Sequence, residues 1–235
     1  MGNIIYDGYS FEDYGVVVSG TGTWNMPERR TQKDNVPGKH GALITDSGEF
    51  DNVTIPYPAW IAHDFADQYE SFERMMALHT DKYYRLEDSY HTDYYRMAKV
   101  VPGIIPEPGT LNRSGRFTIE FDCQPQKWLR SGEIPLEIDD RLELFNSTGY
   151  DAKPVIVIPP GASVIIAHED GSTARLTTTD FGMETTYDAD IEEAIVNGTY
   201  VNEYVTQSGT ISLKPGRNII TASAPIKLTP RFFTI

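Results

Sequence analysis

One candidate for chemistry in this chain is a lysine inside a glycine-rich loop, VPGKHGALITDSGEF at residues 36–50. Backbone N–H groups of such loops can cradle phosphate, with a lysine to neutralise its charge. Lys39 precedes Gly41 instead of following it, however, no Ser or Thr comes next, and the loop leads into a strand-like stretch. We therefore interpret it as a turn at the base of a β arm, where Gly38 and Gly41 supply unusual φ.

Two histidine–aspartate pairs could supply metal ligands, namely His63 with Asp64 and His91 with Asp93. The histidines do not recur at the i, i+4 spacing of a helical site, and the one cysteine, Cys123, cannot complete a cysteine-based zinc site. We interpret both pairs as solvated turn residues and expect no metal site.

Adjacent carboxylates could serve acid–base catalysis, and they occur at residues 12–13, 139–140 and 192–193. With 34 acidic side chains, such adjacency is expected by chance. A glycosidase needs two carboxyl groups facing each other across a cleft, which spacing along the chain does not reveal. The sequence contains no Gly-x-Ser-x-Gly elbow, and no Cys-plus-His arrangement stands out. We expect neither a catalytic centre nor a cofactor site.

Composition narrows the function classes further. The 235 residues carry 34 acidic and 20 basic side chains, a formal charge of −14, and 40% are hydrophobic. Such a chain can pack a core, and its charge repels phosphate backbones and anionic lipid, which argues against a nucleic-acid or membrane-surface binder. The first residues show no signal peptide, so we expect synthesis and folding in a cytoplasm.

Alternation of apolar and polar residues predicts a mainly β protein with one helix in its first half. We expect strands centred on 16–18 and on 50–55, a hairpin formed by 84–86 and 94–101, and a strand at 117–123 in which Cys123 is buried. An amphipathic helix is expected after Pro58, packed on the sheet through a stripe of apolar residues: Ile61, Phe65, Tyr69, Phe72, Met76 and Leu78.

The pattern changes within residues 124–142, which contain two prolines, and we place a domain boundary there, between 138 and 139. Short β-rich runs follow, separated by Pro-Gly and Asp-Gly turns, and this rhythm predicts an antiparallel β-sandwich. Residues 187–205 are compatible with either a strand or a short helical turn.

The order of several short motifs resembles the distal tail protein (Dit) family of long-tailed, siphovirus-type phages. A strand with the pattern F-x-x-Y-G-V, the turn VPGKHG, a helix, a Tyr-rich hairpin and the strand GRFTIEFDCQP follow one another. Lys39 stands where relatives usually carry Arg. The matching positions are Tyr84–Leu86, Tyr95–Ala98 and Phe117–Pro125 in the first half, and Leu213, Pro215, Gly216, Asn218, Pro230 and Arg231 in the second.

The resemblance implies a structural role at the phage tail tip. Residues 1–138 would form a ring-building (belt) β domain with an arm and a helix, and residues 139–235 a galectin-like antiparallel β-sandwich. Six copies would form a hub in the virion that joins the tail tube protein to the tail-tip hub protein and receptor-binding proteins, while DNA passes through the ring without specific binding. The assembly arm would include Arg29, Arg30, Pro37, Gly38, Lys39 and Gly41.

A carbohydrate-binding module that assists attachment to the host surface is the alternative, because galectin-like sandwiches often bind sugars. Sugar rings stack on exposed aromatic side chains, and the second half offers Tyr187, Tyr200 and Tyr204 as candidates. All three tryptophans, Trp24, Trp60 and Trp128, precede the predicted sandwich, which weakens this alternative. A glycoside hydrolase fragment ranks last, since no pair of carboxyl groups is singled out.

Overall fold

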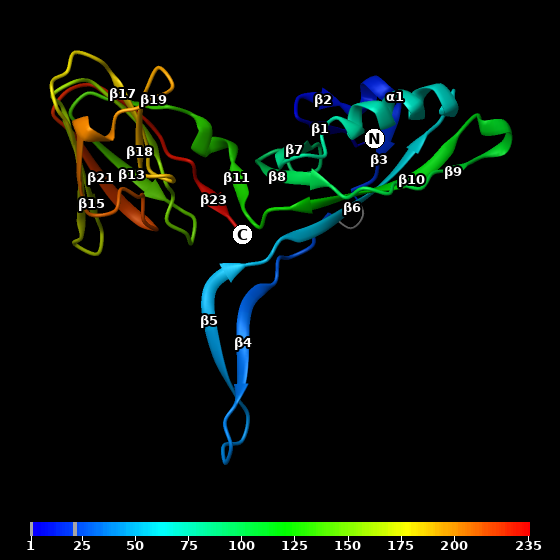
Figure 1. The fold of residues 1–235 in the computed structure, drawn as a ribbon, viewed down its shortest axis with the longest axis horizontal. Helices are drawn as coiled ribbons and strands as arrows, with labels where there is room; N and C mark the ends of the chain where they lie inside the picture. The colour runs from blue at the N-terminus through cyan, green and yellow to red at the C-terminus, as the bar shows by residue number, and fades with distance from the viewer. Residues whose placement is uncertain (1, 21–22) are drawn as a thin grey trace. The chain divides into compact units, whose positions relative to one another are not determined.

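The structure is a computed structural model that describes residues 2–20 and 23–235 (Figure 1). The chain divides into two compact units, the first ending at Lys127 and the second running from Trp128 to Thr234. The division precedes the predicted boundary at 138–139. The reason is that β12 (Leu136–Ile138) pairs with β22 (Ile226–Thr229), which puts Ile138 in the core of the second unit. The boundary is therefore corrected to 127–128.

The first unit is built on an antiparallel sheet with one α-helix. Short 3-10 turns occur at η1 (Phe11–Tyr14) and η2 (Thr110–Asn112), and β9 (Glu107–Pro108) pairs with β10 (Gly115–Cys123). The predicted hairpin, formed by β7 (Tyr84–Asp88) and β8 (Tyr94–Val100), and the predicted alternating strand β10 are confirmed. The strand order is β2 (Tyr9–Ser10), β1 (Ile4–Tyr6), β7 (Tyr84–Asp88), β8 (Tyr94–Val100), β10 (Gly115–Cys123), β6 (Val53–Ile61) and β3 (Val16–Val18).

Strand β6 runs through two prolines and extends beyond the strand that the sequence predicted. It pairs with β10 over nine residue pairs, from Val53↔Cys123 to Ile61↔Gly115. The carbonyl of Pro58 accepts a hydrogen bond from the Ser19 N–H (2.8 Å), on the side of β6 that faces β3. A strand residue directs its N–H and C=O to the same side, so Pro58 removes no donor from the β10 ladder.

The helix α1 (Phe65–Ala77) is shorter than the predicted stripe. Ile61 belongs to β6, and Leu78 lies past the helix end with 76% of its surface exposed, so both assignments to the helix were wrong. The helix buries Phe65, Phe72, Met75 and Met76. The predicted packing of the helix on the sheet is confirmed, because Phe72 is fully buried and its ring lies 5.7 Å from that of Phe117 in β10.

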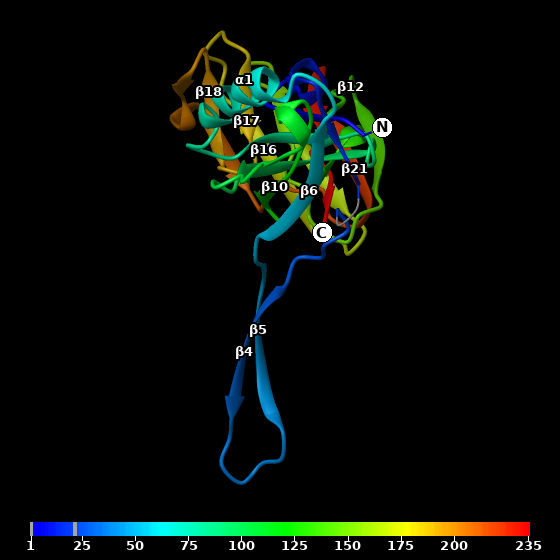
Figure 2. The ribbon, with the colours of Figure 1, turned by 90° about the vertical axis from the view of Figure 1, so that its right-hand side faces the viewer.

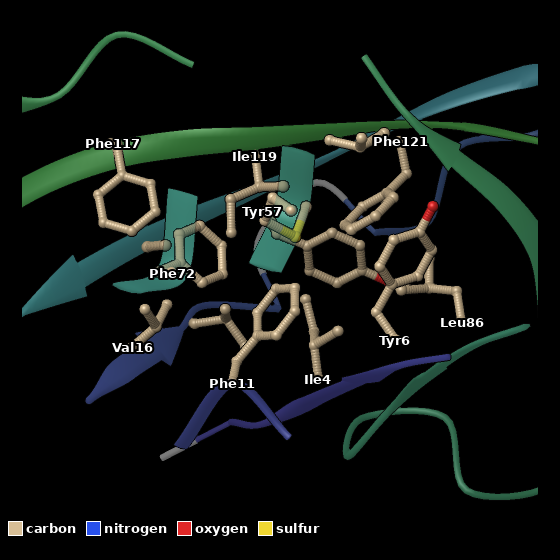
Figure 3. Packing of buried hydrophobic residues seen from close by; sticks show 14 of the residues in the cluster. Ile4, Tyr6, Phe11, Val16, Tyr57, Phe72, Leu86, Phe117, Ile119 and Phe121 are labelled. Carbon is tan, nitrogen blue, oxygen red and sulfur yellow. The ribbon is translucent and has the colours of Figure 1, made fainter. Parts of the chain in front are cut away.

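Aromatic rings fill the core of the first unit (Figure 3). The ring of Phe121 lies 5.1 Å from Tyr6 and 5.9 Å from Tyr57, and all three side chains are buried. Cys123 is fully buried beside them, as predicted, and this burial raises the pKa of its thiol to about 12. The thiol therefore stays protonated and unreactive at neutral pH.

The second unit has two antiparallel sheets with one core between them, as the sandwich prediction required. Residues 187–205, for which the sequence allowed a strand or a helical turn, hold short strands and a 3-10 turn, η4 (Asn202–Tyr204). At the start and end of the unit, β11 (Lys127–Leu129) pairs with β23 (Phe233–Thr234), and η3 (Arg130–Glu133) follows β11. The six-stranded sheet has the strand order β12, β22, β14 (Val155–Ile158), β17 (Thr185–Asp188), β18 (Glu193–Val196) and β19 (Thr199–Tyr200). The five-stranded sheet has the strand order β13 (Arg141–Asn146), β21 (Gly216–Ala222), β15 (Ser163–His168), β16 (Thr173–Thr178) and β20 (Val205–Ser208).

The motif around Leu213–Asn218 is a turn that the buried side-chain amide of Asn218 stabilises by hydrogen bonds to the backbone. The Oδ1 atom of Asn218 accepts a hydrogen bond from the Lys214 N–H (3.0 Å). Its Nδ2 donates to the carbonyls of Lys214 (2.8 Å) and Gly216 (3.1 Å), and Asn218 is fully buried. Gly216 adopts φ +90°, which favours glycine. The Asn218 side chain thus makes hydrogen bonds that the backbone of the turn would otherwise make with water.

We expect Asn218→Ala to lower the free energy of unfolding by about 1–3 kcal/mol, because the substitution leaves partly buried backbone groups of Lys214 and Gly216 without their side-chain partner. Urea unfolding followed by circular dichroism measures the effect. The matched control is Asn35→Ala at an exposed position, where a change within about 0.5 kcal/mol is expected. Equal midpoints for the two variants would show that the amide does not stabilise the turn.

Candidate assembly surface

A β-hairpin stands apart from the core of the first unit (Figures 1 and 2). It consists of β4 (Arg29–Asn35) and β5 (Ala42–Phe50), which form a two-stranded sheet of their own. Every side chain from Arg29 to Glu49 is exposed, on both faces of the hairpin. The predicted arm is therefore present as a self-paired hairpin that contributes no side chain to the core.

The turn VPGKHG lies at the tip of this hairpin, and its predicted position at the base was wrong. It connects Asn35 to Ala42, which face each other in the register of the two strands. The single strand predicted around residues 50–55 is divided between β5 and β6 (Val53–Ile61). Because β5 was not predicted as a separate strand, the turn could not be placed between two strands of a hairpin. Gly38 and Gly41 have φ of +84° and +86°, which confirms that they supply the unusual backbone conformation. The Lys39 N–H donates to the Val36 carbonyl (3.1 Å).

The two arginines of the predicted arm pair within the hairpin. Arg29 contacts Asp46 at 2.6 Å, and Arg30 contacts Glu49 and Asp51, each at 2.7 Å. These bonds raise the pKa of the Arg30 guanidinium and lower the pKa of the Asp46 carboxyl. Exposed ion pairs contribute about 0–1 kcal/mol each, so here they mainly favour one register.

Lys39 and Pro37, by contrast, lie exposed in the turn at the tip. Lys39 has no ion pair and no side-chain hydrogen bond with any residue that the structure describes. Of the predicted arm residues, Lys39 is thus the charged side chain that is available to another molecule.

Polar contacts tie the base of the hairpin to the sheet. Asn52 Nδ2 donates to the Tyr83 hydroxyl (2.6 Å) and to Asp122 Oδ2 (2.9 Å), and the Tyr83 hydroxyl donates to the same Asp122 oxygen (2.5 Å). The bond to Asp122 raises the pKa of the Tyr83 hydroxyl. Asn52 and Asp122 join the hairpin base to β10. The role of Asn52 at the hairpin base was not evident from the sequence, because nothing in its local pattern points to Tyr83 or Asp122.

The hairpin also exposes apolar side chains that no residue described by the structure covers. Val36, Leu43 and Ile44 are 44%, 48% and 60% exposed. An isolated two-stranded hairpin is at best marginally stable in water, and exposed apolar side chains that gather on one element mark an interaction site. The hairpin therefore has the properties of an element that is completed by binding to another molecule.

The three candidate sugar-stacking tyrosines are not brought together on one exposed surface. Tyr187 is only 2% exposed, and its hydroxyl contacts the Gln207 side chain, so its assignment as a sugar contact is corrected to a core role. Tyr200 is 63% exposed in β19, while Tyr204 in η4 stacks on Phe181 with ring centroids 4.5 Å apart. Trp128, expected outside the sandwich domain, belongs to the second unit.

One member of the two histidine–aspartate pairs, His91, is withdrawn from solvent, whereas its predicted partner Asp93 is exposed. His91 is 8% exposed, its Nδ1 lies 3.0 Å from Asp88 Oδ1, and the Trp24 ring packs against it with centroids 4.7 Å apart. The interpretation of His91 as a solvated turn residue was therefore wrong, whereas His63 is exposed. Over residues 2–20 and 23–235, no three His, Cys, Asp or Glu side chains gather as a metal site would require. Across the same residues, no helix has the length and apolar character needed to span a bilayer.

Comparison with known families defines the class of the first unit. Residues 11–123 match the family described as phage tail protein RIFT-related domain. This range runs from η1 to the end of β10 and includes the hairpin and α1. Residues 11–123 are thus similar in sequence to a phage tail protein domain.

Solved structures extend the comparison over nearly the whole chain. The crystal structure of SPP1 Dit, described as a paradigm of the hub adsorption apparatus in phages that infect Gram-positive bacteria, is 17% identical, with 97% of each chain covered and a TM-score of 0.75. A chain of the phage P2 baseplate in its activated conformation with Ca is 9% identical, with 97% of each chain covered and a TM-score of 0.54. No curated protein matches the sequence. The predicted resemblance to distal tail proteins is confirmed by the domain match and the shared, mainly β fold.

Proposed function

We propose that this chain is a structural subunit of a phage tail tip and not an enzyme. Six copies form a closed ring, and this hub joins the tail tube protein to the tail-tip hub protein and to receptor-binding proteins. The observation that carries the proposal is the exposed hairpin with uncovered apolar side chains, in a unit that matches a phage tail domain. The likeness to SPP1 Dit supports it through the shared fold.

The charge of the chain fits a ring through which DNA passes. A net charge of −14 on each copy repels the phosphate backbone, so DNA is not held as it moves through the channel. The proposed location is accordingly the tail tip of the virion.

The solution mass of the full chain tests the proposal. We expect a species of about six times 26.4 kDa, because a closed ring requires a fixed number of copies joined by the same contact. Sedimentation velocity over a range of protein concentrations measures it. A chain that remains monomeric at every concentration would contradict the ring and favour a binding module.

A further inference from the structure

A groove of about 1180 Å³ lies in the first unit, beside the outward-facing residues of β6 and β10. The loop between β8 and β10 forms its other wall. The groove is large and open compared with sites that enclose small ligands, which usually measure about 300–1,000 Å³. Its lining includes Pro58, Trp60, Ile104, Ile105, Glu107, Arg116, Thr118 and Glu120.

The groove and the hairpin belong to opposite ends of one strand ladder. The hairpin continues into β6 at the Val53↔Cys123 end, where Asn52 binds Asp122. The groove is lined by residues from the Ile61↔Gly115 end of the ladder, and it extends along β10 as far as Glu120, which pairs with Pro56. The first and last of the nine residue pairs are eight residue steps apart, a distance of about 27 Å. A projecting element at one end of a strand ladder and a groove toward its other end can form the two halves of a head-to-tail contact.

The wall of the groove carries apolar side chains that could pack against those of the hairpin tip. Trp60 and Ile104 are half-buried on its wall, and Ile105 is 80% exposed. The tip offers Leu43 and Ile44, each about half exposed or more. Burial of these side chains against one another would remove apolar surface of both elements from water.

The charges of the two elements are also complementary. Residues 29–50 carry four basic and three acidic side chains, a net charge of +1, whereas the rest of the chain carries 16 basic and 31 acidic side chains, a net charge of −15. Within residues 35–45 the only Lys, Arg, Asp or Glu is Lys39. The groove presents exposed Glu107 and Glu120, with Arg116 as its one basic residue.

We propose that this groove receives the hairpin tip of a second copy of the chain, with Lys39 facing Glu107 and Glu120 and with Leu43 and Ile44 against Trp60 and Ile104. The inference rests on the proposed function, since it names the surface that the assembly hairpin occupies. Repetition of the contact in one direction joins each copy to the next and closes a ring.

Disulfide trapping between separate chains tests the contact. Ala42→Cys in the hairpin and Thr118→Cys in the groove are both exposed and leave Lys39, Glu107 and Glu120 in place. The native Cys123 is fully buried and does not compete. The two variants are mixed at equal amounts, assembled and oxidised. We expect a linked dimer on a non-reducing gel only in the mixture, and none when Glu73→Cys, exposed on α1, replaces Thr118→Cys.

A charge exchange gives an independent measurement. Glu107→Lys combined with Glu120→Lys is expected to raise the protein concentration at half-assembly about tenfold, and the addition of Lys39→Glu should restore it. An assembled parent ring with no linked dimer and no effect of the charge exchange would overturn the groove contact but not the proposed function. A parent that never assembles would overturn both. A link that forms within one doubly substituted monomer would assign the groove to the chain's own hairpin and overturn the contact between copies.

Discussion

Replacement of residues 30–49 by an Asn-Gly turn is expected to abolish ring formation and to leave both units folded. The side chains removed are all exposed, so the core loses no contact. Arg29 and Phe50 face each other in the hairpin register, and a two-residue Asn-Gly turn closes such a pair without strain. A closed ring needs the same contact at each step, so the loss of one partner element removes every contact at once.

Sedimentation velocity of the shortened chain beside the parent measures the loss, with circular dichroism as the test of folding. A phosphate-binding loop would behave differently, since Lys39→Ala would then remove phosphate binding and leave the oligomer unchanged. A folded, shortened chain that still forms the full ring would exclude the hairpin as the assembly element.

Truncation of the buried helix side chain Phe72 is expected to have the largest effect on stability. Phe72→Ala should lower the free energy of unfolding by about 3–5 kcal/mol, as core aromatic truncations do. The side chain is fully buried, and its ring lies 5.0 Å from Phe11 and 5.7 Å from Phe117, so truncation opens a cavity between α1 and the sheet.

Urea unfolding gives the midpoint and its slope for Phe72→Ala and for the control Leu78→Ala. Leu78 is 76% exposed just past the same helix, and its truncation should change stability by no more than about 0.5 kcal/mol. A Phe72→Ala midpoint equal to that of the control would mean that the helix does not pack on the core in solution and is instead an interface element.

The two largest predictions separate the stability of the subunit from its assembly. Phe72 and its neighbours hold the first unit together, whereas the hairpin contributes to no buried cluster in the chain. Substitutions in the core should therefore reduce the amount of folded chain, and substitutions in the hairpin should leave folded chains that do not associate. The same preparation distinguishes the outcomes, because unfolding is read by circular dichroism and association by mass.

Part of this fold could be predicted from the local alternation of apolar and polar residues. Phe117, Ile119, Phe121 and Cys123 alternate with polar residues, and β10 buries that face. The sandwich strands could be predicted for the same reason, because apolar residues recur at every second position in any strand with one buried face. The arm and its glycines were also evident, because polar, turn-rich stretches add little to a core and positive φ favours glycine.

The tertiary structure decided the features that depend on distant neighbours. Pro58 is tolerated within β6 because its backbone nitrogen and carbonyl point toward the β3 side and not toward β10. Residues 53–61 by themselves do not reveal which strand lies on each side of β6. The burial of Tyr187 depends on which face of β17 meets the opposite sheet, and that of His91 on Trp24 and Asp88. The tip position of the VPGKHG turn required the pairing of β4 with β5. The sequence determines which residues suit a strand, a turn or a core, but burial and register are set by contacts between segments far apart in the chain.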